Sequence, residues 1–282
     1  MEAVVACPLC GEAKQVEVVS YPELSFARCV GCSLVYKRAQ RSSLGRGYER
    51  AYFEKGGARY LERFEHRVRK CRNQLLAALE FAPAAGDVLD VGCSTGYVLE
   101  AARRLGLRAV GADTSEFAVR LCRERGYAAE VGQLTALPFP DASFDVVTAK
   151  HTLEHSAQPL QALRELRRVL RPGGVAFLIV PDVEYWKATV LRRSGSYYRP
   201  DRLGWQHAVY YSDATLARAC AAAGLTPVRA GKAIYRSRLA RGPRAAWEGL
   251  RVAGVKVWNT TARALHLRRE IQLIARRAPE LS

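Results

Sequence analysis

The sequence predicts an α/β protein with a doubly wound, mostly parallel sheet, preceded by a small cysteine-rich unit. Three observations lead there. An apolar segment runs through an acid into a glycine-bounded turn at residues 88–96, strand-like and helix-like segments alternate from residue 86 onward, and two C-x-x-C pairs stand near the N-terminus. With 282 residues, 49% of them hydrophobic, the chain can form one large domain or a medium domain with attachments.

The segment at residues 88–96 predicts a strand, a tight turn and a helix. The strand ends near Asp90, Gly92 and Gly96 bound the turn, and helical spacing of apolar residues begins at position 97. A helix N-terminus collects unpaired amide donors and a partial positive charge, and glycines let a ligand approach the backbone. The turn therefore predicts a binding site for a nucleotide-like cofactor.

The alternation that follows predicts the sheet. We expect strands at residues 87–92, 107–113, 127–131, 144–149 and 175–180, and helices at residues 97–105, 116–125 and 160–170, the last one stopped by the Arg-Pro-Gly-Gly segment at residues 171–174. Such alternation is typical of a doubly wound parallel sheet, in which ligands bind at the carboxyl ends of the strands.

Asp113 ends the second predicted strand, 21 residues after Gly92. An acid at this place can accept both ribose hydroxyls of an adenosine, whether the cofactor is NAD or S-adenosylmethionine. The dinucleotide fingerprint, however, has the pattern G-x-G-x-x-G, and this chain has Ser94 at the second glycine position. The turn therefore favours a cofactor without a pyrophosphate.

Five segments in order along the chain carry a resemblance to a known family. Residues 88–96, 110–115, 137–147, 151–155 and 170–174 resemble the corresponding segments of class I S-adenosylmethionine-dependent methyltransferases, particularly the small-molecule branch related to the ubiquinone O-methyltransferase. The resemblance covers roughly residues 60–275. It implies a Rossmann-like, seven-stranded sheet whose final strand, near residues 270–275, is antiparallel.

The resemblance also implies the residues that bind the cofactor S-adenosylmethionine: Asp90, Gly92, Cys93, Ser94, Thr95, Gly96, Asp113, Thr114, Gln133, Leu134 and Lys150. Asp90 and the turn would face the methionine end, Asp113 would hold the ribose, and Gln133 and Leu134 would flank the adenine. Gln133 departs from the acid found there in many relatives, but its amide can still hydrogen-bond to adenine.

A hydroxyl acceptor must lose its proton during methyl transfer, and histidine is the usual base near neutral pH. His207, in the loop before the last large helix, and His151, at the end of the fourth strand, are the predicted catalytic residues. His155 belongs to a Leu-Glu-His segment that resembles a structural element of the relatives. His66 and His266 lie on charged helical faces, where we expect them to be solvated.

The two C-x-x-C pairs consist of Cys7, Cys10, Cys29 and Cys32, with 18 residues between the pairs. This spacing predicts a zinc ribbon, in which four thiolates hold structural Zn²⁺ and leave no coordination position open. Two disulfides or a redox-active pair are the alternatives. We expect the isolated cysteines to be reduced thiols, and the cysteine usage indicates a reducing cytoplasm: Cys71, Cys93, Cys122 and Cys220.

Three parts of the chain are expected: a zinc ribbon at residues 1–40, a helical bridge or lid at residues 41–82, and the cofactor domain at residues 83–282. The last contains an aromatic-rich insertion at 182–206, which either walls the acceptor or packs as a loop. It also contains basic amphipathic helices at 240–269, which either pack on the domain, form a homodimer surface or contact anionic lipid or RNA.

The formal net charge is +17, from 44 basic and 27 acidic residues. No apolar segment is long enough for a membrane span, and no signal peptide is expected.

The sequence predicts a cytoplasmic methyltransferase that acts on a small molecule, at a hydroxyl of a sugar, polyketide or other secondary metabolite. The charge leaves an RNA base methyltransferase as the alternative, although the fourth-strand segment lacks the Asn-Pro-Pro-Tyr type of motif. A non-catalytic scaffold with the same fold is the third reading, and the glycine pattern disfavours an NAD oxidoreductase.

Overall fold

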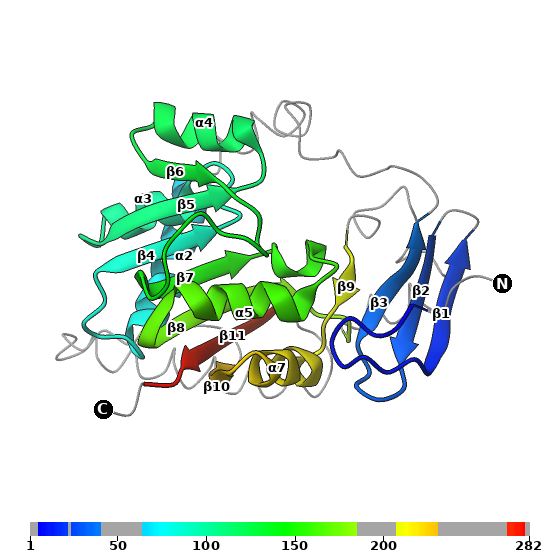
Figure 1. Ribbon diagram of the computed structural model, residues 1–282. Coiled ribbons are helices and arrows are strands. Elements are labelled where there is room, and N and C mark those ends of the chain that lie inside the picture. Colours follow the sequence, from blue (N-terminus) through cyan, green and yellow to red (C-terminus); the bar gives the residue numbers. More distant parts are fainter. Residues whose placement is uncertain (1–4, 22–23, 41–63, 185–206, 231–269, 280–282) are drawn as a thin grey trace, which may run out of the picture.

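A seven-stranded sheet forms the centre of the molecule, in a computed structural model that describes residues 5–21, 24–40, 64–184, 207–230 and 270–279 (Figure 1). The strand order is β10-β11-β8-β7-β4-β5-β6. The strands are β4 (Asp87–Val91), β5 (Arg108–Asp113), β6 (Ala128–Val131), β7 (Phe144–Lys150), β8 (Leu170–Pro181), β10 (Leu225–Ala230) and β11 (Glu270–Arg277). β11 runs antiparallel to both of its neighbours, and β4 to β8 are parallel. The mostly parallel sheet and its antiparallel strand at residue 270 confirm the predicted fold class.

Helices cover both faces of the sheet because successive strand residues point to opposite sides. Val88 packs with α2 (Phe64–Leu79) and α3 (Tyr97–Arg103). Its neighbour Leu89 packs in the cluster that holds α5 (Pro159–Val169) and α7 (Asp213–Ala222). Among the described helices, α4 (Glu116–Glu124) packs against β5 and β6, and Ser115 at its N-cap accepts a hydrogen bond from the amide of Ala118.

The strand order reverses at β4, which lies between β5 and β7. Ligands of open α/β sheets bind where the order reverses, outside the carboxyl ends of the strands. The glycine-bounded turn follows β4 and therefore stands at this place.

The helix predicted at residues 160–170 ends at Val169, close to the predicted stop, but the strand predicted at residues 175–180 begins earlier than expected. β8 already begins at Leu170, which pairs with Phe144 of β7. The register between the two strands shifts after Phe144, and Gly173 accommodates the irregularity with φ +81°. Pairing with β7 thus extends the strand through a Pro-Gly-Gly segment that locally reads as a turn.

The N-terminal unit is a second sheet, made of β1 (Gln15–Tyr21), β2 (Leu24–Cys29), β3 (Val35–Gln40) and β9 (Val209–Tyr210). The strand β9 comes from the segment just before α7, and it pairs antiparallel with β3. Figure 1 shows β1 to β3 beside the main sheet, with β9 between them and α5. The N-terminal unit is therefore joined to the rest of the chain by a shared sheet.

The two parts also share a core. Leu34 and Tyr36 of the N-terminal unit belong to the same buried cluster as Tyr211 and Leu216. The side chain of Arg218 in α7 donates a hydrogen bond to the carbonyl of Gly31 over 3.1 Å.

Several predicted features lie outside the described residues. These are the lid within 41–63, the basic helices at 240–269 with His266, and the aromatic insertion apart from residues 182–184. Within the described ranges, no helix has both the length and the apolar character needed to cross a bilayer.

Candidate active site

A cavity of about 680 Å³ lies at the carboxyl ends of β4, β5 and β7. Its size is in the usual range for a site that takes a small molecule or cofactor. Most of the predicted cofactor residues line it: Asp90, Gly92, Cys93, Ser94, Asp113, Thr114, Gln133, Leu134 and Lys150. The predicted catalytic residues His151 and His207 line the same cavity. The structure therefore brings together residues from five separate parts of the chain.

The turn after β4 requires its two glycines. Gly92 has φ +77° and Gly96 has φ +84°, which are left-handed conformations that side chains rarely adopt. A Cβ at Gly92 would also overlap the side chain of Thr152, and one at Gly96 would lie 2.9 Å from Cδ2 of Tyr127. The backbone can therefore pass between these side chains only without a Cβ.

Two predicted cofactor residues, Thr95 and Gly96, are not among the residues that line the cavity. Thr95 is buried, and its carbonyl accepts a hydrogen bond of 2.8 Å from Arg125. Gly96 caps α3. Both lie behind the turn because the chain has already curved into the helix at this point.

Asp113 is fixed at the end of β5 by backbone amides. Its Oδ1 accepts a hydrogen bond from the amide of Ser115, and its Oδ2 accepts one from the amide of Ser94, each over 2.9 Å. Each carboxylate oxygen keeps a further lone pair that can accept a hydroxyl. Burial raises the pKa of Asp113, while the amide hydrogen bonds oppose the shift. The carboxylate thus offers two acceptor oxygens at the wall of the cavity.

Asp90 is the second aspartate that lines the cavity, and its relative exposure is 3%. The hydroxyl of Thr148 on β7 donates a hydrogen bond to its Oδ1 over 2.5 Å. Burial raises the pKa of Asp90 to about 7, although Thr148 and the charge of Lys150 favour the ionised form. A buried acid that titrates near neutrality can respond to a cationic ligand by losing its proton.

His151 directly follows β7 and has φ +52°. Its Nε2 lies 3.2 Å from Oε1 of Glu270, and its Nδ1 lies 3.5 Å from Oε1 of Glu154. Burial alone lowers the pKa of His151, but the two carboxylates outweigh burial and raise the pKa to about 9. The imidazole is therefore protonated at neutral pH, which opposes a role as general base.

His207 differs from His151 in its protonation. Burial lowers the pKa of His207 to about 4, so that its ring is neutral. The ring packs edge-on against His155, with centroids 4.9 Å apart, and against Tyr210, with centroids 5.4 Å apart. Its Nδ1 has no hydrogen-bond partner among the described residues.

Several residues that line the cavity were not predicted as site residues from the sequence: Arg67, Cys71, Tyr97, Glu154 and His155, the last of which was assigned a structural role. Arg67 and Cys71 belong to α2, which precedes the turn by about 20 residues in the sequence. Only the tertiary structure shows that this helix lies beside the turn. Glu154 and His155 form the end of the short helix η1 (Leu153–His155). The signal that could have found them is the density of acid and imidazole in residues 151–155.

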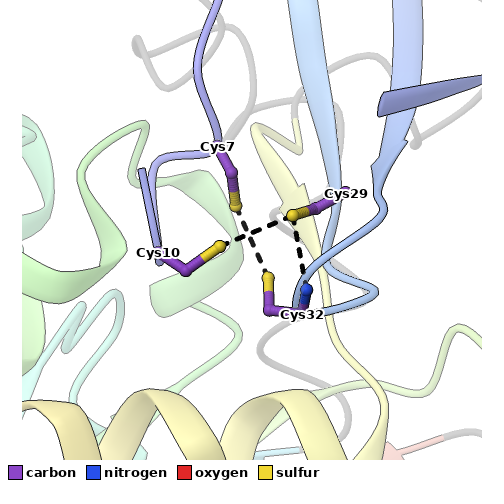
Figure 2. A group of neighbouring side chains, drawn as sticks. All are labelled: Cys7, Cys10, Cys29 and Cys32. Atoms are coloured by element: carbon purple, nitrogen blue, oxygen red, sulfur yellow. Dashed lines mark hydrogen bonds between the residues drawn. The ribbon is translucent and has the colours of Figure 1, made fainter. Parts of the chain in front are cut away.

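Figure 2 shows the four N-terminal cysteines converging on one point. The Sγ atoms of Cys7 and Cys32 are 3.5 Å apart, as are those of Cys10 and Cys29, and all four lie within 4.8 Å of one another. Sulfur ligands of tetrahedral zinc, with bonds of about 2.3 Å, lie roughly 3.8 Å apart. The spacing therefore fits a zinc ion, and none of the eight cysteines is in a disulfide.

Part of the chain is similar to a known protein family. Residues 89–178 match the family model described as a methyltransferase domain. The segment that carries most of the cavity lining is therefore similar to methyltransferase domains. The match begins in β4 and ends in β8, so it includes the turn, Asp113 and the segment of His151.

Two curated relatives are similar over this region. The 27-O-demethylrifamycin SV methyltransferase of Amycolatopsis mediterranei is 38% identical over 112 residues, which are 35% of this chain and 41% of that protein. The ubiquinone biosynthesis O-methyltransferase of Pseudomonas paraeruginosa is 36% identical over 102 residues, 34% of this chain and 44% of that protein. The chain thus spans less than half the length of these relatives.

Solved structures with low sequence identity align with a larger part of this chain than the curated relatives do. The CcbJ methyltransferase from Streptomyces caelestis aligns with a TM-score of 0.50 at 17% identity, over 74% of this chain and 89% of that one. At this identity the likeness supports the methyltransferase fold alone.

Proposed function

We propose that this protein is an S-adenosylmethionine-dependent methyltransferase that methylates a hydroxyl of a small molecule. The observation that carries the proposal is the cavity, since one space of about 680 Å³ is lined both by the cofactor turn with Asp113 and by Lys150, His151 and His207. When bound, S-adenosylmethionine supplies a sulfonium whose methyl group is electrophilic. The protein has then mainly to align an acceptor oxygen with this methyl.

The residues on the wall fit such a cofactor. Asp113 would accept the two ribose hydroxyls with lone pairs that the Ser94 and Ser115 amides leave unused. Gln133 and Leu134 follow β6 and would flank the adenine. Asp90, at the end of β4, would face the methionine end, where its carboxylate can pair with the ammonium group.

His207 and His151 are our candidates for the acceptor side of the cavity. His207 is neutral and would contact the acceptor hydroxyl through its ring nitrogen. His151 is a cation held between Glu154 and Glu270, so its contribution would be positive charge on the wall rather than removal of a proton. Both named relatives are methyltransferases of small molecules by their names, and this supports a small acceptor such as a secondary metabolite.

We further propose that the four cysteines hold structural zinc. The distances between the sulfur atoms support this, and four thiolates would leave no position open for chemistry. The ion would stabilise a small sheet whose third strand pairs with β9, two residues after His207. The ribbon would thereby help to hold one side of the acceptor site.

An RNA acceptor is the second candidate, favoured by the net charge of +17. The deciding experiment incubates the full chain with methyl-labelled S-adenosylmethionine and either hydroxylated small molecules or total RNA. Label in a small molecule supports the proposal, and label in RNA, with salt-dependent RNA binding, supports the second candidate. Calorimetry that detects no binding of S-adenosylmethionine would favour a non-catalytic scaffold over both.

A further inference from the structure

Three metal-ligating side chains meet on the acceptor side of the cavity. Glu154 and His155 come from η1, and His207 comes from the segment before β9. A carboxylate oxygen and one ring nitrogen from each histidine lie within 4.8 Å of one another. All three residues line the cavity, so a ligand bound between them would be accessible from it.

Glu154 is the most unusual of the three. Its relative exposure is 1%, and neither carboxylate oxygen has a hydrogen-bond donor among the described residues. Its ion pair with Nδ1 of His151 spans 3.5 Å, too long for a strong hydrogen bond. The protonated His151 therefore compensates the charge of Glu154 without supplying a hydrogen bond, and a buried carboxylate in this state is costly unless a metal ion or another donor also contacts its oxygens.

The Nδ1 atom of His207 provides a second, independent observation. This buried atom also lacks a hydrogen-bond partner within the described part of the chain. The carboxylate of Glu154 and this ring therefore present unsatisfied polar atoms to the same small space. Of the species that could satisfy both, a cation bound by oxygen and nitrogen fits the donor set.

The local backbone holds these side chains together. The left-handed His151 turns the chain out of β7 into η1, which places Glu154 inside. The amide of Ala208 then donates a hydrogen bond to the carbonyl of Glu154 over 2.8 Å. Since Ala208 adjoins His207, this bond fixes the histidine beside the carboxylate. The cluster is thus built by two chain segments about 50 residues apart that are joined through the backbone.

We propose that Glu154, His155 and His207 form a binding site for a divalent transition-metal ion such as Zn²⁺, Co²⁺ or Mn²⁺. Two imidazoles and one carboxylate are typical ligands of these ions, and three protein ligands leave positions open toward the cavity. Ligand atoms about 2.1 Å from a metal lie roughly 3.0–3.4 Å apart, so side-chain atoms that are within 4.8 Å of one another would close by up to roughly 1.5 Å on binding.

The site would have a consequence for catalysis, and this consequence rests on the proposed function. A hydroxyl oxygen of the acceptor could occupy an open position, and the metal would lower the pKa of that hydroxyl. The proton could then leave to solvent without a histidine base. An acceptor with two neighbouring oxygens would bind best because it could chelate the ion.

The test is a Co²⁺ titration of the full chain after metal has been removed with a chelator. Co²⁺ at the four cysteines gives intense thiolate-to-metal absorption, whereas a site of nitrogen and oxygen ligands gives only weak bands. We expect one equivalent that produces the intense absorption and one further equivalent that does not. The second should be lost in Glu154→Gln and in His207→Asn, and retained in His66→Asn, a control at an exposed histidine of α2.

The intense absorption and a cooperative thermal transition show in each variant that the chain is folded. If either variant fails to fold, His155→Asn replaces it. The proposal is overturned if the wild-type chain binds only the thiolate-ligated equivalent, or if folded variants keep the second one. Calorimetry with S-adenosylmethionine is measured separately, so loss of the proposed function and loss of the metal site can be told apart.

Discussion

The amide of Ser94 donates a hydrogen bond to Oδ2 of Asp113 over 2.9 Å. This bond joins the turn after β4 to the end of β5, so the two elements that would hold the methionine end and the ribose of the cofactor are positioned relative to each other before any ligand binds. Such preorganisation reduces the entropy lost on binding.

Replacement of Asp113 by alanine should weaken binding of S-adenosylmethionine about 10- to 100-fold, because hydrogen bonds from the ribose to a charged acceptor would be lost. Isothermal calorimetry measures the change. Asp113→Asn keeps one acceptor oxygen and should give an intermediate affinity, which also separates loss of the ligand contact from damage to the turn.

Glu130→Gln is the matched control for this prediction, since Glu130 is an exposed acid on the adjacent strand β6. Its affinity should equal that of the wild-type chain. Equal affinities for Asp113→Ala and the wild-type chain would contradict the placement of the ribose.

Ser94 has φ +50°, a left-handed conformation that costs a non-glycine residue about 1–2 kcal/mol. Ser94→Gly removes this strain, while glycine loses about 0.5–1 kcal/mol of chain entropy on folding. We expect the free energy of unfolding to rise by up to about 1 kcal/mol, with binding of S-adenosylmethionine retained because the bond to Asp113 comes from the backbone. Urea denaturation measures the first effect, and a clear loss of stability would show that the serine side chain contributes more than the strain costs.

Asp90 predicts a pH dependence. Its pKa in the folded chain, about 7, is raised above the ordinary value, so the folded protein retains a proton that the unfolded chain releases near pH 4. The contribution of Asp90 to stability is therefore present below about pH 4 and declines as the pH rises toward about 7.

The affinity of the Asp90 carboxylate for a cationic ligand depends on pH in the opposite direction to its contribution to stability. The affinity for S-adenosylmethionine should increase between about pH 5 and about pH 7, by at most about tenfold per pH unit, and then level off. Calorimetry across this range measures it. Asp90→Asn should bind more weakly at pH 8 and lack the slope attributable to Asp90; an unchanged slope in this variant would assign the dependence to another group.

If the four cysteines hold zinc as proposed, its removal should destabilise more than the N-terminal sheet, because Cys7, Cys29 and Cys32 belong to the core cluster that also holds Tyr211 and Leu216. A chelator should lower Tm by on the order of 10 °C, corresponding to about 3 kcal/mol in a chain of this size. Differential scanning calorimetry measures the shift.

Cys10→Ser is the informative variant because Cys10 is exposed and its replacement removes a ligand without opening the core. Val30→Ser alters an exposed residue of the other C-x-x-C turn and should melt like the wild-type chain. If added zinc left Tm unchanged in the wild-type chain, the four cysteines would have another role.

The turn after β4 and its proximity to Asp113 could be predicted from the sequence because the signals are local. Glycines at positions 92 and 96 determine the turn, and Asp113 ends a strand parallel to the one before it. Parallel strands bring their carboxyl ends to one edge, so this pattern is enough to place the acid beside the turn. The cysteine spacing likewise predicted a cluster that the structure confirms.

The acceptor side could not be predicted in this way. The pairing of β3 with β9 joins residues about 170 positions apart and leaves no periodic signal in either segment. The start of β8 depends on pairing with Phe144 rather than on local propensity. The position of Arg67 on the wall depends on how α2 packs over α3.

The sequence alone thus determined the sheet, its glycine-bounded turn and the grouping of four cysteines, since each is specified by backbone preference or by short spacing along the chain. Only the tertiary structure decided the chemical state of the two candidate histidines. His151 is held protonated by Glu154 and Glu270, whereas His207 is kept neutral by burial. Charge and desolvation depend on which distant groups surround a side chain, and these neighbours exist only once the chain has folded.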